Sequence, residues 1–135
     1  MESIPSQETP TLVVDDDEGL LLSIKATLIS AGLPEPALLS DSRRALDLLR
    51  TRRFHLVLLD LMMPHVGGMD VLTQVNEEFP DIDCVVVSAT DDVSTAVRAM
   101  SSGAADYLVK PLNGEKLVAL VQSYIEKHRF REELS

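Results

Sequence analysis

Five side chains with carboxylate, hydroxyl or amine chemistry stand directly after short, mainly apolar runs of this sequence. They are Asp15 and Asp16 after Thr11–Val14, Asp60 after Leu56–Leu59, Ser88 after Cys84–Val87, and Lys110 after Tyr107–Val109. Each alone has an ordinary explanation as a turn residue, a helix cap or a solvated lysine. Five chemically compatible groups at equivalent positions instead indicate one shared site.

The apolar runs and the segments between them predict the elements that would position this site. Short unbroken apolar runs are typical of strands buried on both faces, as in a parallel sheet. The expected strands are 11–14, 34–39 (the least regular, because it contains two prolines), 56–59, 84–87 and 107–109. Helical spacing follows each strand, over about 19–31, 42–50, 69–79, 92–102 and from 113 onward. Five alternating units predict an α/β fold with helices on both faces of a parallel sheet, whose ligands bind beyond the carboxyl ends of its strands.

Length, charge and cysteine content limit the classes of function. The 135 residues predict one domain over 11–126, between a disordered lead-in at 1–10 and a helical extension or linker at 127–135. A net charge of −10 argues against nucleic acid or an anionic membrane as a partner of this segment. The single cysteine excludes an internal disulfide and fits a reducing compartment. With no signal-peptide pattern and no apolar run of membrane-spanning length, cytoplasmic localisation is expected.

The chemistry of the five side chains is that of phosphoryl transfer to a carboxylate. Clustered carboxylates repel and raise one another's pKa unless a cation neutralises them. Oxygen ligands without histidine or cysteine select a hard ion, Mg²⁺ or alternatively Mn²⁺. Lys110 is a mobile point charge for a phosphoryl oxygen, and the Ser88 hydroxyl can donate to another. The histidines at 55, 65 and 128 follow no strand of the predicted sheet, so none is assigned general-base work.

The chain resembles the receiver domain of a two-component response regulator from Thr11 to Glu126. The matching motifs are Val13–Asp16, Leu59–Pro64 with Gly68, Ser88–Ala89 and Gly103–Pro111. The resemblance implies a flavodoxin-like (βα)5 sandwich, with a five-stranded parallel sheet of order 2-1-3-4-5, which is the strand order of known receiver proteins. It also implies a phosphoacceptor that dephosphorylates itself, not an enzyme that turns over an external substrate.

The resemblance further implies roles for the acidic residues. Asp60 would accept a phosphoryl group from the phosphohistidine of a sensor histidine kinase or a phosphotransfer protein. Asp16, Asp60 and the backbone carbonyl of Met62 would bind Mg²⁺, and Asp15 would act mostly through a bound water. Lys110 would pair with the phosphoryl group, and its peptide bond to Pro111 would be cis.

The same resemblance implies a switch. Ser88 would move to hydrogen-bond the phosphoryl group, and Tyr107 would then turn inward. The face made by the fourth helix, fifth strand and fifth helix would change and control an output domain or partner, with transcription as one target. From the residues alone, Tyr107 could equally be a half-buried aromatic side chain on an edge strand. That face, or the C-terminal helix, could also support a homodimer.

Two other classes of protein stay open at this point. A Mg²⁺-dependent phosphohydrolase of the haloacid-dehalogenase type would use Asp15, from the D-x-D at residues 15–17, as its nucleophile. That interpretation leaves Asp60 unexplained, and the chain has neither a cap domain nor an acidic pair closing its fourth strand. A pseudo-receiver serving only as an interaction module would lack Asp16, Asp60 or Lys110, and all three are present. Residues 17 and 18 are equally well explained as helix-start residues.

Overall fold

The structure is a computed structural model that describes residues 9–64 and 66–134. The expected lead-in therefore lies outside the described residues from 1 to 8. Pro10 is buried, and its backbone carbonyl accepts hydrogen bonds from the backbone N–H groups of His55 and Leu56. The chain thus enters the sheet along the start of the third strand.

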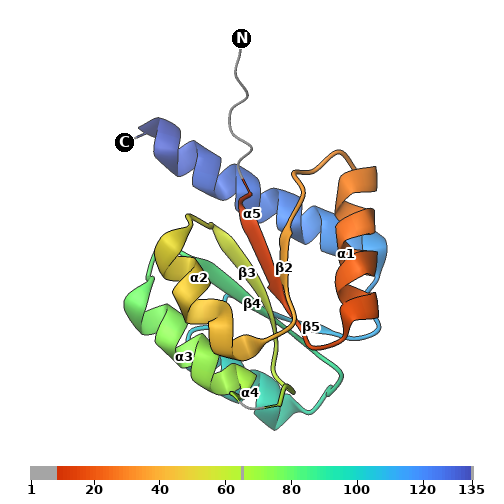
Figure 1. Ribbon diagram of the computed structural model, residues 1–135, viewed down its shortest axis with the longest axis vertical. Helices are drawn as coiled ribbons and strands as arrows, with labels where there is room; N and C mark the ends of the chain where they lie inside the picture. Colours follow the sequence, from red (N-terminus) through yellow and green to blue (C-terminus); the bar gives the residue numbers. More distant parts are fainter. Residues whose placement is uncertain (1–8, 65, 135) are drawn as a thin grey trace.

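Strands and helices alternate along the whole described chain (Figure 1). The strands are β1 (Thr11–Val14), β2 (Ala37–Leu39), β3 (Leu56–Asp60), β4 (Asp83–Ser88) and β5 (Asp106–Val109). The helices are α1 (Glu18–Ser30), α2 (Ala45–Thr51, preceded by the 3-10 turn η1, Ser42–Arg44), α3 (Gly68–Glu78), α4 (Val93–Ser101) and α5 (Gly114–Leu134). All pairings are parallel in the order β2-β1-β3-β4-β5, which confirms the predicted fold and strand order.

The helices form two layers on opposite faces of the sheet (Figure 1). Alternate strand residues point to opposite faces, so Val14 and Leu59 pack in the core beneath α2 and α3, whereas Val13 and Leu58 pack beneath α1 and α5. All four side chains are at most 2% exposed. This two-sided burial explains why the strands appear in the sequence as continuous apolar runs.

Several boundaries differ from the sequence prediction by one or a few residues, and those of β2, β3 and β4 have local reasons. Strand β2 begins only at Ala37, because Pro34 and Pro36 have no N–H to donate to a neighbouring strand. Strands β3 and β4 are longer than predicted and include Asp60 and Ser88 as their last residues, since Asp60 still pairs with Val87 in the ladder. The two polar side chains are therefore held by strand geometry.

The C-terminal helix continues well past the expected domain end at 126. His128 is 5% exposed, and its Nε2 lies 2.8 Å from Oδ2 of Asp83 at the start of β4. The ring of His128 also stacks on that of His55, with 4.8 Å between centroids. The last turns of α5 thus pack against the amino end of the sheet, opposite the predicted site. Among the described residues, no helix combines the length and apolar character needed to cross a membrane.

Candidate functional site

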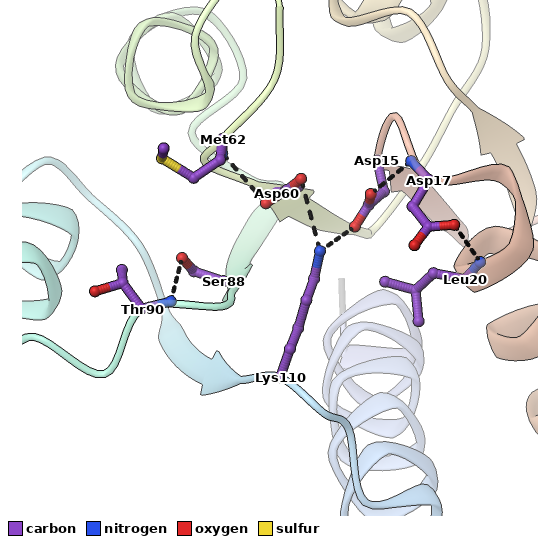
Figure 2. Close-up of polar contacts among 8 residues, drawn as sticks. All are labelled: Asp15, Asp17, Leu20, Asp60, Met62, Ser88, Thr90 and Lys110. Atoms are coloured by element: carbon purple, nitrogen blue, oxygen red, sulfur yellow. Dashed lines mark hydrogen bonds and ion pairs between the residues drawn. The ribbon is translucent and has the colours of Figure 1, made fainter.

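The register of the sheet places the predicted side chains at one edge (Figure 2). Val14 pairs with Leu59, so Asp15, which follows β1, lies next to Asp60, the last residue of β3. Ser88 pairs with Val109, so it lies beside the residue that precedes Lys110. The structure therefore brings together residues that lie up to 95 positions apart in the sequence.

Three carboxylates converge at this edge and form an acidic cluster. Asp15, Asp16 and Asp60 each offer an oxygen that lies within 4.8 Å of the others. Asp15 and Asp60 are only 2% and 4% exposed, whereas Asp16 is exposed to solvent. Asp17 points away and caps α1, where its Oδ1 accepts a hydrogen bond from Leu20 N at 3.1 Å. The helix-cap explanation is therefore confirmed for Asp17.

Lys110 extends from the end of β5 into this acidic cluster (Figure 2). Its Nζ donates to Oδ2 of Asp15 at 2.8 Å and lies 3.6 Å from Oδ2 of Asp60. Burial alone lowers the pKa of Lys110, but the bond to Asp15 and the charges of Asp15 and Asp60 raise it above the usual value. The amine is thus held fully charged. The Lys110–Pro111 peptide bond is cis, as the resemblance implied.

The single positive charge of Lys110 does not neutralise the acidic cluster, and the pKa of Asp60 is therefore raised. Burial raises that pKa above the ordinary aspartate value, and the charges of Asp15 and Asp16 raise it further. A hydrogen bond from Met62 N to Asp60 Oδ1 at 3.2 Å and the charge of Lys110 act in the opposite direction without reversing the shift. A cation would favour the ionised form, and three carboxylates with all-oxygen donors suit a hard divalent ion. The residues present fit Mg²⁺.

Gly68 allows α3 to begin directly against the strand that carries Asp60. A Cβ at this position would lie 2.5 Å from the Cα of Leu61 and closer still to the backbone oxygen of Asp60. Gly68 N donates to the carbonyl of Leu61 at 3.1 Å, which closes the base of the β3–α3 loop. The sequence indicated Gly68 only as part of a motif, because its steric role depends on contacts outside its own helix.

Ser88 and Tyr107 are connected through a residue that the sequence did not single out. Ser88 is fully buried, and its Oγ accepts a hydrogen bond from Thr90 N at 3.2 Å (Figure 2). The Tyr107 hydroxyl donates to the carbonyl oxygen of Thr90 at 2.9 Å. Thr90 therefore joins the Ser88 hydroxyl to the half-buried aromatic ring on β5. A position two residues after Ser88 has no sequence signal of its own.

Comparison with known proteins identifies the family. Residues 11–122 match the family model described as the response regulator receiver domain. The response regulator MprA of Mycolicibacterium vanbaalenii is 37% identical over 116 residues, which cover 86% of this chain and 50% of MprA. The transcriptional regulatory protein ZraR of Klebsiella oxytoca is 34% identical over 126 residues, which cover 93% of this chain and 28% of ZraR. The beryllofluoride-activated receiver domain of DrrB, a Thermotoga maritima protein, has a TM-score of 0.78 at 27% identity and covers 88% of this chain and 99% of its own.

This chain belongs to the response regulator receiver domain family of two-component signalling, and its fold is flavodoxin-like. The match spans most of the described α/β unit and includes the acidic cluster, Ser88, Tyr107 and Lys110. The chain spans about half the length of MprA and a smaller share of ZraR.

Proposed function

We propose that Asp60 accepts a phosphoryl group from the phosphohistidine of a sensor histidine kinase or a phosphotransfer protein, in a Mg²⁺-dependent reaction. The observation that carries this proposal is the convergence of three carboxylates within 4.8 Å, with the Lys110 amine 2.8 Å from one and 3.6 Å from another. Asp60 is the acceptor because it ends the central strand and keeps one oxygen close to the amine without the direct bond that occupies Asp15.

The transfer forms a bond between a carboxylate oxygen of Asp60 and phosphorus, and it breaks the phosphorus–nitrogen bond of the donor, whose imidazole leaves. Lys110 needs to move little to reach the new phosphoryl oxygens, because its Nζ already lies 3.6 Å from Asp60. Bound Mg²⁺, held by Asp16, Asp60 and the Met62 carbonyl with Asp15 contributing mostly through water, would neutralise phosphoryl charge; Mn²⁺ is the alternative ion.

The proposed response runs through Ser88, Thr90 and Tyr107. When the Ser88 hydroxyl moves to donate to a phosphoryl oxygen, the turn that holds Thr90 moves with Ser88. The hydrogen bond from the Tyr107 hydroxyl to the Thr90 carbonyl transmits this movement to Tyr107, which turns inward. The face reached by this change is apolar and exposed: Val93 and Val97 of α4 are 74% and 56% exposed. A shallow groove of about 490 Å³ lies between α4 and β5 there.

This face is the proposed contact for an output domain, a partner or a second copy of the chain. The relative MprA is named a response regulator, and ZraR is named a transcriptional regulatory protein. The proposed output is therefore control of transcription by an attached or separate module. The α5 turns beyond residue 126 could continue toward such a module or contribute to a homodimer. We place the protein in the cytoplasm, without direct binding of nucleic acid or membrane by this segment. Sedimentation that finds a strict monomer with and without beryllofluoride would remove the homodimer.

Acetyl phosphate tests the acceptor directly. With Mg²⁺, intact-mass spectrometry should show one added phosphoryl group on the wild-type protein, none on Asp60→Asn, and none when EDTA removes the metal. Asp15→Asn should still be labelled, more slowly. Labelling that survives in Asp60→Asn but not in Asp15→Asn would assign the chemistry to a hydrolase-type nucleophile. A wild-type protein inert to both acetyl phosphate and beryllofluoride would be a pseudo-receiver.

A further inference from the structure

Strand β2 places none of its described side chains in the acidic cluster, yet the turn after it contacts the loop that follows Asp60. Ser42, the first residue of η1, is 5% exposed. Its hydroxyl donates to the carbonyl oxygen of Val66 at 2.7 Å, with the carbonyl of Pro64 at 3.5 Å as a second, weaker acceptor. A buried serine aimed at the main chain of another loop is a specific long-range contact, 24 positions apart in the sequence.

The turn that carries Ser42 is itself fixed. Asp41 caps η1, with its Oδ1 accepting from Arg43 N at 3.0 Å, and the Arg43 guanidinium pairs with the same carboxylate. Behind this turn, Asp15 N donates to the carbonyl of Leu39 at the end of β2 at 3.1 Å. The Ser42 hydroxyl is thus presented from a capped turn, which follows a strand that is hydrogen-bonded to the backbone of Asp15.

The loop that Ser42 contacts is the one that follows Asp60. Its start is fixed by the bond from Met62 N to Asp60, and its end by the bond from Gly68 N to Leu61. Between those points, the Ser42 hydroxyl ties Val66 and, more weakly, Pro64 to a different segment of the chain. The loop that supplies the proposed Met62 carbonyl ligand is therefore hydrogen-bonded at Met62, at Gly68 and, between them, at Pro64 and Val66.

We propose that Ser42 is a positioning residue for the metal and phosphoryl site: its hydroxyl holds the main chain at Pro64 and Val66, so that the Met62 carbonyl is positioned beside the acidic cluster before the ion arrives. This inference rests on the proposed function. A ligand loop that is already ordered binds more tightly, because binding does not have to supply the cost of ordering it. Ser42 acts through the loop and touches no reacting atom.

The test is the Mg²⁺ affinity of Ser42→Ala, measured by calorimetric titration or by amide NMR shifts. Loss of one hydrogen bond should raise the Kd for Mg²⁺ by roughly fivefold. The initial rate of labelling by acetyl phosphate should fall by a similar factor at low Mg²⁺ and return to within about twofold of wild type at saturating Mg²⁺. A role in stability alone would not produce this recovery with metal.

Two variants on α5 serve as controls. Ser123→Ala removes a bond of the same kind and length, from Oγ to the Leu120 carbonyl at 2.7 Å, on an exposed turn far along α5. Val121→Ala destabilises the core, where Val121 is 1% exposed, without touching the loop. Both should keep the wild-type Kd for Mg²⁺.

An unchanged Kd in Ser42→Ala would overturn the proposal, as would a Val121→Ala variant that weakens Mg²⁺ binding equally at equal loss of stability. Failure of the wild-type protein to bind Mg²⁺ or to be labelled would instead refute the proposed function, so the two failures are distinguishable.

Discussion

Replacing Asp60 with asparagine should make the metal-free protein more stable, although it removes the proposed acceptor. Asp60 is 4% exposed and lies within 4.8 Å of Asp15 and Asp16, so its charge is both buried and repelled. The raised pKa of Asp60 has the same cause, burial first and then the neighbouring carboxylates. Asparagine has nearly the same shape and no charge.

The expected size follows from the distances. At an effective dielectric constant near 20, repulsion between two charges at 4.8 Å is about 3.5 kcal/mol. Attraction to Lys110 at 3.6 Å is about 4.6 kcal/mol on the same basis. The exposed Asp16 repels more weakly than Asp15, while relief of the burial cost favours asparagine. The net gain in the free energy of unfolding should be about 1–2 kcal/mol at pH 7.

The assay is urea unfolding followed by far-UV circular dichroism, since the chain has no tryptophan. Because the pKa of Asp60 is raised in the folded state, neutral Asp60 forms more easily there than in the unfolded chain. Protonation of Asp60 contributes its full stabilisation below the pKa of aspartate in the unfolded chain, about 4. That stabilisation is lost as the pH rises through the pKa of Asp60 in the folded protein. The advantage of Asp60→Asn should therefore disappear toward pH 4.

Added Mg²⁺ should remove most of the stability advantage of Asp60→Asn. At ten times its Kd, the ion should stabilise the wild-type protein by about 1.4 kcal/mol and the variant by less. Asp81→Asn, in an exposed turn, controls for the general effect of lowering the net charge of −10. If Asp60→Asn is less stable than wild type in EDTA at pH 7, the cluster is not electrostatically strained, and the argument for a cation fails.

Two further predictions concern residues around the cluster. Gly68→Ala should lower the free energy of unfolding by about 2 kcal/mol or more and slow labelling of Asp60, because its Cβ would overlap the β3 backbone. The control is Gly67→Ala, which should be nearly neutral in the same urea titration because its Cβ would have no neighbouring atom within 4 Å. Tyr107→Phe deletes the hydroxyl bond to the Thr90 carbonyl and should cost about 1 kcal/mol of stability while leaving the labelling rate of Asp60 within about twofold. A large loss of labelling in Tyr107→Phe would place the Tyr107 hydroxyl in the chemistry itself and contradict the switch assigned to it.

The sequence by itself determined the order of elements, the parallel sheet and the residues that stand at its carboxyl edge. Those features are local: a short apolar run such as Leu56–Leu59, set between helical segments, is typical of a buried parallel strand, and the residue after it lies at the end of that strand. The same local logic predicted the cap at Asp17 as one explanation of that residue. Strand boundaries shifted where the ladder continued, as at Asp60, or where proline shortened a strand, as in β2.

Only the tertiary structure decided which of these groups interact. Lys110 forms a hydrogen bond with Asp15 and lies slightly farther from Asp60. These distances depend on the relative positions of three strands, and Lys110 and Asp15 are 95 positions apart in the sequence. The steric demand at Gly68 and the bond from Ser42 to Val66 depend on how separate segments approach one another. Hydrophobic periodicity indicates which face of its own helix or strand a residue occupies. These contacts arise instead from packing between separate elements, and no local pattern in a single sequence encodes them.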